Sequence, residues 1–501
     1  MHCDVRIQRI YKRKPEVNVI QFSLNGQTVQ VTDIDPNMTI LRYLRTVSMH
    51  SATKEGCAGG DCGACSILVA EEAQQGQLRF QAINACIALL GSLDGKTIFT
   101  VEALKVGDHL HPVQQAMVDY HGAQCGFCTP GIVASLAALY HNKGGAQATD
   151  EEIHEALSGN LCRCTGYRPI IDAAKAMNAY PAPSQDSPAS STGVVQFDPC
   201  APNSLEQAAV SQAGKHLFIP ETEGQLSQLL KDYPDATLWA GGTDLGLELT
   251  QQFKRFDVII SLHKLASLTK VTETDDDISF GAMVTYSDAE AHLAKQFPAF
   301  AQLIQRIAAR QIRNLGTLGG NVANASPIGD TPPVFLALNA RVELASINGK
   351  REVALDDFFK GYKVTDLQKG EYLRQIIVPK LTAQQSLHVF KVSKRKEDDI
   401  SAVLAGVRIE HDGSNITDAR IAFGGMAATP LRAVNTEKDL MGKPFELSSF
   451  EHAAEHIQND YSPMKDVRAT AEYRLNVASN LIIKTGLEIF EPESLTQGGH
   501  A

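Results

Sequence analysis

The 501-residue sequence lacks an apolar stretch long enough to cross a membrane. Its apolar runs are short, as in Gly131 to Tyr140, whereas a membrane-spanning helix needs about 20 such residues. The basic N-terminus, Met1 to Val17, lacks an apolar core, so it is not a secretory signal, and Asp4 and the few serines argue against a transit peptide. Positive charge is not in excess, because the net charge is -11, which argues against a nucleic-acid-binding protein.

The length and the cysteine content set the broad class of protein. At 501 residues the chain exceeds the size at which one hydrophobic core stops growing, so three or four domains are expected. It contains ten cysteines. Because the chain is long and lacks a secretory signal, we expect a cytoplasmic protein whose thiols stay reduced and free to bind metal.

Five blocks follow one another along the chain. In the block 15–100, residues 17–35 alternate in polarity around an Asn-Gly pair, and the whole block is predicted to be a small β-rich domain with a hairpin and one helix. Residues 101–180 have helical spacing, and residues 181–205 are rich in Pro, Ser and Ala, which is typical of a linker. Mixed α/β patterns over 206–385 and an α+β block over 386–490 complete the chain.

Four cysteines belong to a glycine-rich loop and the segment after it. They are Cys57, Cys62, Cys65 and Cys86, with the spacing C-x4-C-x2-C and a fourth cysteine after twenty residues. This is plant-type [2Fe–2S] spacing, and glycine in the loop lets amide N–H groups point at the sulfurs of a cluster. The alternatives are buried packing cysteines and a zinc site, although structural zinc usually takes C-x2-C pairs, which Cys57 and Cys62 do not form.

A second group consists of two pairs at the predicted N-termini of two helices. Its members are Cys125, Cys128, Cys162 and Cys164. Unpaired N–H groups at helix starts favour an anionic ligand, so two pairs can make one four-thiolate site. By spacing alone, zinc remains an alternative for this group. Cys3 and Cys200 stand apart from both groups as bystanders.

The segments "CAGGDCGAC", "QCGFCTPG" and "LCRCTGYRPI" resemble the two-cluster iron–sulfur domains of the xanthine dehydrogenase / aldehyde oxidase family of molybdenum hydroxylases. The resemblance covers about residues 15 to 180. It implies one [2Fe–2S] cluster for each cysteine group. It also implies a β-grasp ferredoxin domain followed by a four-helix domain.

Two glycine-rich stretches follow the linker. In "LWAGGTDLG" a strand precedes Gly-Gly-Thr-Asp, whose backbone N–H groups can cradle a diphosphate, although an ordinary glycine turn is the alternative. It is not the Rossmann pattern G-x-G-x-x-G. The second stretch, Arg313 to Asp330, combines glycines with Asn324, Ser326 and other polar side chains suited to a polyhydroxy ligand; a polar loop between strands is the alternative.

Together these stretches resemble the FAD domain of the same family, which has the vanillyl-alcohol-oxidase fold and is followed by an α+β flavoprotein domain. Ile307 occupies a position that is usually aromatic in the family. The resemblance implies diphosphate contacts at Leu238, Trp239, Ala240, Gly241, Gly242, Thr243, Asp244 and Leu245 and at Thr317, Leu318, Gly319, Gly320 and Asn321. It implies flavin-side contacts at Asp330, Leu373 and Lys391. The charge run Lys394 to Asp399 is either a solvated loop or a border of the flavin site.

The resemblance also implies a function. Two clusters and FAD form a conduit that links single-electron steps to two-electron chemistry. In the family the electrons come from a molybdenum–pterin cofactor, whose domain follows the FAD domain, and this sequence ends at Ala501 without it. We therefore expect an electron-transfer subunit without catalytic side chains of its own. Its expected partner is a large molybdopterin-binding chain in a heterotetramer or larger assembly, and its expected final acceptor is NAD+.

Overall fold

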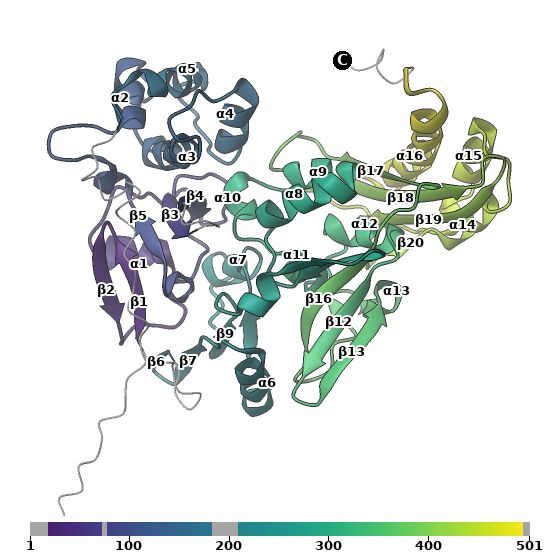
Figure 1. Ribbon diagram of the computed structural model, residues 1–501, viewed down its shortest axis with the longest axis horizontal. Helices are drawn as coiled ribbons and strands as arrows, with labels where there is room; N and C mark the ends of the chain where they lie inside the picture. Colours follow the sequence, from purple (N-terminus) through teal and green to yellow (C-terminus); the bar gives the residue numbers. More distant parts are fainter. Residues whose placement is uncertain (1–18, 73–77, 183–208, 494–501) are drawn as a thin grey trace, which may run out of the picture.

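The computed structural model describes residues 19–72, 78–182 and 209–493 (Figure 1). Most of the expected linker, together with Cys3 and Cys200, lies outside these residues. The cysteine-bearing segments lie at one side of the molecule, and the C-terminal sheet with its helices lies at the other (Figure 1). Among the described residues, no helix combines the length and apolarity that crossing a bilayer requires.

The first sheet has the strand order β2-β1-β5-β3-β4. The predicted hairpin is confirmed, because Leu24 pairs with Gln27 across Asn25 and Gly26, which both have positive φ. Strand β5 ends at Phe99, and residues 101–104 form the 3₁₀ helix η3. The elements are β1 (Ile20–Leu24), β2 (Gln27–Val31), α1 (Ile40–Thr46), β3 (Ser66–Glu72), β4 (Leu78–Asn84), η2 (Leu90–Leu93), β5 (Thr97–Phe99) and η3 (Val101–Leu104).

Four helices form the second unit, as the sequence predicts. Thr149 and Glu152 form the reciprocal bonds of a capping box at the start of α4. Cys128 is the N-cap residue of α3, and Cys162 and Cys164 lie in the loop before α5. The elements are α2 (Pro112–Asp119), α3 (Thr129–Asn142), α4 (Asp150–Leu157), α5 (Arg168–Ala176) and the short η4 (Met177–Ala179).

The first sheet is covered on both faces. Leu68 and Ala82 belong to a buried cluster that includes Ile132 of α3 in the helical unit. The alternate residue Ile67 belongs to another cluster, which continues into Trp239 of the next part of the chain. Because successive strand residues point to opposite faces, the sheet is held between the helical unit and the part that begins at residue 209.

Residues 209–381 contain a four-stranded sheet of order β6-β7-β9-β8, in which β7, β9 and β8 are parallel, and a five-stranded sheet of order β10-β11-β16-β12-β13. Their strands are β6 (Val210–Gln212), β7 (Lys215–Phe218), β8 (Thr237–Trp239), β9 (Val258–Ser261), β10 (Val271–Glu273), β11 (Asp277–Gly281), β12 (Arg341–Ser346), β13 (Gly349–Ala354) and β16 (Tyr372–Pro379), beside the hairpin β14 (Phe359–Gly361) and β15 (Val364–Thr365). The helices are α6 (Glu223–Asp232), α7 (Leu245–Thr250), η5 (Ala266–Thr269), α8 (Tyr286–Gln296), α9 (Pro298–Gln305), α10 (Arg310–Arg313), α11 (Leu318–Ala323), α12 (Thr331–Ala337) and α13 (Leu355–Phe358).

The last part is an antiparallel sheet of order β17-β18-β19-β20, with helices packed against it, as expected for an α+β unit (Figure 1). Helix α12 of the preceding part also packs on β18 and β19. The elements are β17 (Gln385–Val392), β18 (Val403–His411), β19 (Ile416–Gly424), β20 (Leu431–Arg432), α14 (Val434–Leu440), α15 (Leu447–Ala454), η6 (Ile457–Asn459) and α16 (Ala471–Phe490).

Candidate functional site

The first cysteine loop is wound tightly around the sulfur of Cys57. The backbone N–H groups of Gly59 and Cys62 donate hydrogen bonds of 3.3 and 3.4 Å to Cys57 Sγ. Ala58 takes a left-handed conformation with φ of 50°, as glycines 60 and 63 do. The loop thus aims its amides inward at sulfur, as the glycine content predicts.

The four thiols of this group lie next to one another. Cys57 contacts Cys62 and Cys86, and Cys86 also contacts Cys65. Hydrogen bonds from the Cys62 and Cys86 side chains lower the pKa of Cys57, and the two amides add to that effect. The environment therefore favours a thiolate at Cys57, which is the form that binds metal.

The second cysteine group also comes together, at the surface of the helical unit. Cys125 and Cys164 are exposed with their sulfurs 3.6 Å apart, whereas Cys128 and Cys162 are buried and contact each other. Burial, followed by the contact with Cys162, raises the pKa of Cys128 to about 12. This sulfur is therefore a neutral thiol unless a metal ion deprotonates it.

Both groups fit binuclear iron–sulfur clusters. In the second group the sulfurs associate in two pairs, Cys125 with Cys164 and Cys128 with Cys162, and each iron of a [2Fe–2S] cluster takes two thiolates, whereas structural zinc needs four ligands around one point. Within the ranges that the structure describes, no three His, Cys, Asp or Glu side chains gather around one metal-ion position. The amides directed at Cys57 are the usual support for cluster sulfur.

The two cysteine groups touch through backbone. The N–H of Leu161, which precedes Cys162, donates to the carbonyl oxygen of Cys62 at 2.9 Å. The Asn160 amide donates to the carbonyl oxygen of Gly63 at 3.2 Å. A methyl group on Gly131 in α3 would lie 2.0 Å from that same Gly63 oxygen, so only glycine permits this approach.

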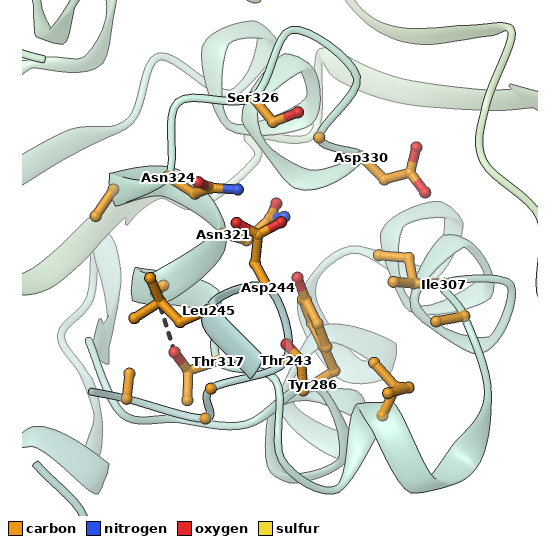
Figure 2. Close-up of a pocket in the computed structure, with 18 of the residues that line it drawn as sticks. Thr243, Asp244, Leu245, Tyr286, Ile307, Thr317, Asn321, Asn324, Ser326 and Asp330 are labelled. Carbon is orange, nitrogen blue, oxygen red and sulfur yellow. Dashed lines mark hydrogen bonds between the residues drawn. The ribbon is translucent and has the colours of Figure 1, made fainter. Parts of the chain in front are cut away.

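A cavity of about 630 Å³ lies between the glycine-rich stretches, and Figure 2 shows many of the side chains around it. The volume is in the range of small-molecule sites. Trp239 and Leu318 do not line it, because their side chains are buried in the neighbouring cores. The other predicted residues do: Leu238, Ala240, Gly241, Gly242, Thr243, Asp244, Leu245, Thr317, Gly319, Gly320, Asn321, Asp330, Leu373 and Lys391. Asn324, Ser326 and Ile307 also line it.

Two glycines let the stretches meet at this cavity. A methyl group on Gly241 would lie 1.9 Å from the carbonyl oxygen of Leu315, so the two backbones approach more closely than any side chain allows. Gly242 has φ of 70° and lies against the ring of Trp239. The ring of Trp239 therefore supports the turn by packing against Gly242, although this side chain does not line the cavity.

A buried ion pair forms one wall of the cavity. Lys391 of β17 donates to Asp330 at 2.6 Å, and the hydroxyl of Ser401 donates to the second oxygen of Asp330, also at 2.6 Å. Both charged side chains are nearly inaccessible to water. The wall thus holds a cation and a carboxylate in fixed positions, which suits contact with a polar ring edge.

Tyr286 is a lining residue that the sequence analysis missed. It lies at the start of α8, its backbone N–H donates to Gly316, and its ring packs against that glycine. The residue is 5% exposed, and only burial and the charges of Asp330 and Asp244, with no hydrogen bond, act on its hydroxyl among the described residues. Burial, with the carboxylates of Asp330 and Asp244, raises the pKa of Tyr286, so it stays a neutral donor directed into the cavity (Figure 2). Nothing in the local sequence signals this role.

The cavity wall is completed from two distant segments. Gly59 and Asp61 of the first cysteine loop line it, and so do Arg395, Asp398 and Asp399 of the charge run. Burial, together with the Asp61 carboxylate, raises the pKa of Asp398 to about 6. Part of the charge run therefore borders the cavity, while its remaining side chains face solvent.

Four family models match consecutive parts of the chain. They are "2Fe-2S iron-sulfur cluster binding domain" at residues 22–91, "[2Fe-2S] binding domain" at 100–175, "FAD binding domain in molybdopterin dehydrogenase" at 211–381 and "CO dehydrogenase flavoprotein C-terminal domain" at 388–489. The chain belongs to the molybdenum hydroxylase family. It carries the iron–sulfur and FAD-binding portion of that family.

Members of the family with curated names include the xanthine dehydrogenase of Emericella nidulans, 33% identical over 483 residues, which cover 85% of this chain and 35% of that protein. The xanthine dehydrogenase/oxidase of Gallus gallus is 30% identical over 551 residues, covering 95% of this chain and 40% of that protein. The chain thus spans 35 to 40% of the length of these relatives.

Two solved structures are similar to a little over half of the chain. Carbon monoxide dehydrogenase from Hydrogenophaga pseudoflava matches with a TM-score of 0.52 and 28% identity, covering 54% of this chain and 95% of the matched chain. Quinoline 2-oxidoreductase from Pseudomonas putida 86 matches with a TM-score of 0.51 and 28% identity, covering 55% and 96% of the two chains. The family therefore includes members that act on different substrates.

Proposed function

We propose that this chain is the electron-transfer part of a xanthine dehydrogenase, which delivers electrons from a molybdenum cofactor on a partner chain to NAD+. Cys57, Cys62, Cys65 and Cys86 would hold one [2Fe–2S] cluster, and Cys125, Cys128, Cys162 and Cys164 the other. FAD would occupy the cavity between the glycine-rich stretches. When bound, the clusters carry single electrons and the flavin accepts two, which it can pass on as hydride.

The proposal rests on one observation, which is that the three sites touch one another in sequence. Leu161, beside the second cysteine group, bonds to Cys62 of the first, and the loop of the first group lines the cavity with Gly59 and Asp61. The sites are therefore contiguous, from the surface of the helical unit to the cavity. A chain with this order needs no moving domain between its redox centres.

The partner is expected at the helical unit. Cys125 and Cys164 are exposed there, and so are the apolar side chains of Phe127 and Leu161, at 47 and 48% of their surface. Exposed apolar side chains beside a redox site suit a protein interface. We propose a large molybdopterin-binding chain as that partner, in a heterotetramer or larger assembly that converts hypoxanthine and xanthine to urate.

The side chains of the cavity have separate roles in holding FAD. The glycine turns present backbone N–H groups to a diphosphate, and Tyr286 adds a neutral hydroxyl donor. Asp330 and Lys391 offer an acceptor and a cation to the flavin ring edge. Ile307 offers an aliphatic surface where an aromatic residue is usual.

Electron paramagnetic resonance of the reduced full chain tests the cluster assignment. Cys128→Ser should abolish one of two [2Fe–2S] signals while FAD remains bound, and Cys65→Ser should abolish the other. Cys200→Ser, which changes a cysteine outside both groups, is the matched control and should keep both signals. Zinc in place of iron and acid-labile sulfide would reject the clusters and support a zinc-stabilised scaffold instead.

Turnover of the purified complex tests the substrate and the acceptor. The proposal expects oxidation of xanthine that depends on NAD+, and turnover unchanged by NAD+ would reject the dehydrogenase assignment. The quinoline 2-oxidoreductase similarity supports a second candidate, an equivalent subunit of an N-heterocycle or aldehyde hydroxylase. Turnover of those substrates but not of xanthine would favour it.

A further inference from the structure

Helix α7 joins the FAD cavity to the first cysteine loop. It begins directly after the Gly-Gly-Thr-Asp turn and ends at Thr250. The Thr250 hydroxyl donates to the carbonyl oxygen of Ala58 at 2.6 Å and also lies 2.8 Å from the carbonyl oxygen of Gly246. Because a hydroxyl has one proton, the shorter bond to the cysteine loop takes the larger share of it.

The carbonyl of Ala58 belongs to the same peptide unit as the N–H of Gly59. That N–H donates to Cys57 Sγ at 3.3 Å. The left-handed conformation of Ala58 turns this peptide so that one end meets Thr250 and the other meets sulfur. The two hydrogen bonds therefore act in series, from a hydroxyl of the FAD-binding part to a sulfur of the first cysteine group.

Helix α7 also abuts the segment that carries Cys86. A methyl group on Gly246 would lie 2.6 Å from the carbonyl oxygen of Ile87, which follows Cys86. The helix thus packs against the backbone beside two of the four cysteines. Thr250 has little freedom to leave Ala58 while α7 keeps this position.

We propose that Thr250 is a positioning residue that tunes the reduction potential of the cluster held by the first cysteine group; this inference rests on the function proposed above. A peptide whose carbonyl accepts a hydrogen bond is a stronger N–H donor, by about 10–30% per bond. Hydrogen bonds to cluster and cysteine sulfur stabilise the reduced state, which carries the extra negative charge. The Thr250 hydroxyl therefore raises the potential of this cluster and favours its reduction.

The test compares Thr250→Ala with Thr250→Ser in the full chain, by redox titration followed with electron paramagnetic resonance. Valine is avoided, because its methyl group would take the place of a hydroxyl that lies 2.6 Å from an oxygen. In Thr250→Ala we expect the reduced-to-oxidised ratio of this cluster, at a fixed solution potential, to fall by about two- to fourfold. Thr250→Ser keeps the donor and should titrate like the wild type.

The second cluster is an internal reference in the same samples. It should titrate identically in all three proteins, since the hydrogen bonds of the Thr250 hydroxyl go to Ala58 and Gly246 and not to the second cysteine group. Equal potentials of the first cluster in the alanine and serine variants would overturn the inference, and so would a parallel shift of both clusters. Loss of the first signal in Thr250→Ala alone would also overturn it, because the hydroxyl would then be a structural requirement. Absence of both signals from the wild type would instead overturn the proposed function.

Discussion

The backbone N–H of Leu161 donates a 2.9 Å hydrogen bond to the carbonyl oxygen of Cys62. Leu161 immediately precedes Cys162 in the chain, so a single hydrogen bond links the backbone next to the second cysteine group with the backbone of the first. The groups nevertheless differ in their surroundings. Cys65 and Cys86 are buried beneath the parts that bind FAD and the helices, whereas Cys125 and Cys164 are open to solvent.

This difference predicts the order in which the clusters are lost. When the isolated chain is treated with an iron chelator under mild oxidation, the signal of the helical-unit cluster should decay first, because two of the cysteines that we propose hold it, Cys125 and Cys164, are exposed. The measurement is the decay of the two electron paramagnetic resonance signals, assigned with Cys65→Ser and Cys128→Ser. Addition of the molybdenum chain should slow only the faster decay. Equal decay of both signals would contradict the expected docking face.

Tyr286→Phe should weaken FAD binding by about tenfold, which corresponds to about 1.4 kcal/mol, because it removes one hydrogen bond to a buried polar ligand without changing the ring. The measurement is recovery of flavin fluorescence on dilution. Tyr233→Phe is the matched control, since Tyr233 lies outside the cavity at the end of α6. Equal affinity of both variants would mean that the Tyr286 hydroxyl does not touch the ligand.

A histidine pair, one member buried and the other largely so, predicts acid sensitivity of the helical unit. His111 and His141 lie with their Nε2 atoms 3.3 Å apart. Burial lowers the pKa of His111 to about 3 and that of His141 to about 4, whereas the pKa of an unfolded histidine is about 6.5. The unfolded chain therefore takes up protons first, so the stability that the pair contributes is complete above pH 6.5 and is lost as the pH falls toward 4.

The slope of that loss approaches about 1.4 kcal/mol per pH unit for each histidine. His141→Gln keeps an acceptor but cannot be protonated, so the midpoint of thermal unfolding should depend less steeply on pH between about 4 and 6.5. His109→Gln changes an exposed histidine and should leave the slope as it is. An unchanged slope in His141→Gln would show that the histidine pair does not cause the loss of stability at acidic pH.

Gly131→Ala should destabilise the protein by about 3 kcal/mol, although alanine is the better helix former, because the added methyl group would meet the Gly63 carbonyl oxygen. Gly224→Ala is the matched control in another helix, where the nearest atom lies at 3.9 Å, and it should be neutral or stabilising. Urea unfolding measures both. Similar stability of the two variants would show that α3 can move away from the cysteine loop.

Local patterns predicted much of this molecule. The spacing of Cys57, Cys62 and Cys65 determines a loop that turns around sulfur, and the Asn25-Gly26 pair determines a hairpin, because each depends on a few consecutive residues. The domain limits at residues 100, 180 and 385, like the individual ligand assignments, stay predictions.

Contacts between distant segments could not be predicted in this way. Thr250 and Ala58 are 192 residues apart, so spacing carries no information about their hydrogen bond. Tyr286 reaches the cavity only because Gly316 leaves room for its ring. Trp239 differs from its neighbours in the predicted run, because the alternation along a strand turns its side chain into the core, so its predicted contact stays a prediction for the backbone alone.

The first sheet has the helical unit on one face and the start of the FAD-binding part on the other. A separate ferredoxin has to find its electron acceptor by diffusion and release it after each transfer. Here the docked state is part of the folded core. Electron transfer from the helical unit to the cavity should therefore be first order, with a rate constant that depends neither on solvent viscosity nor on protein concentration.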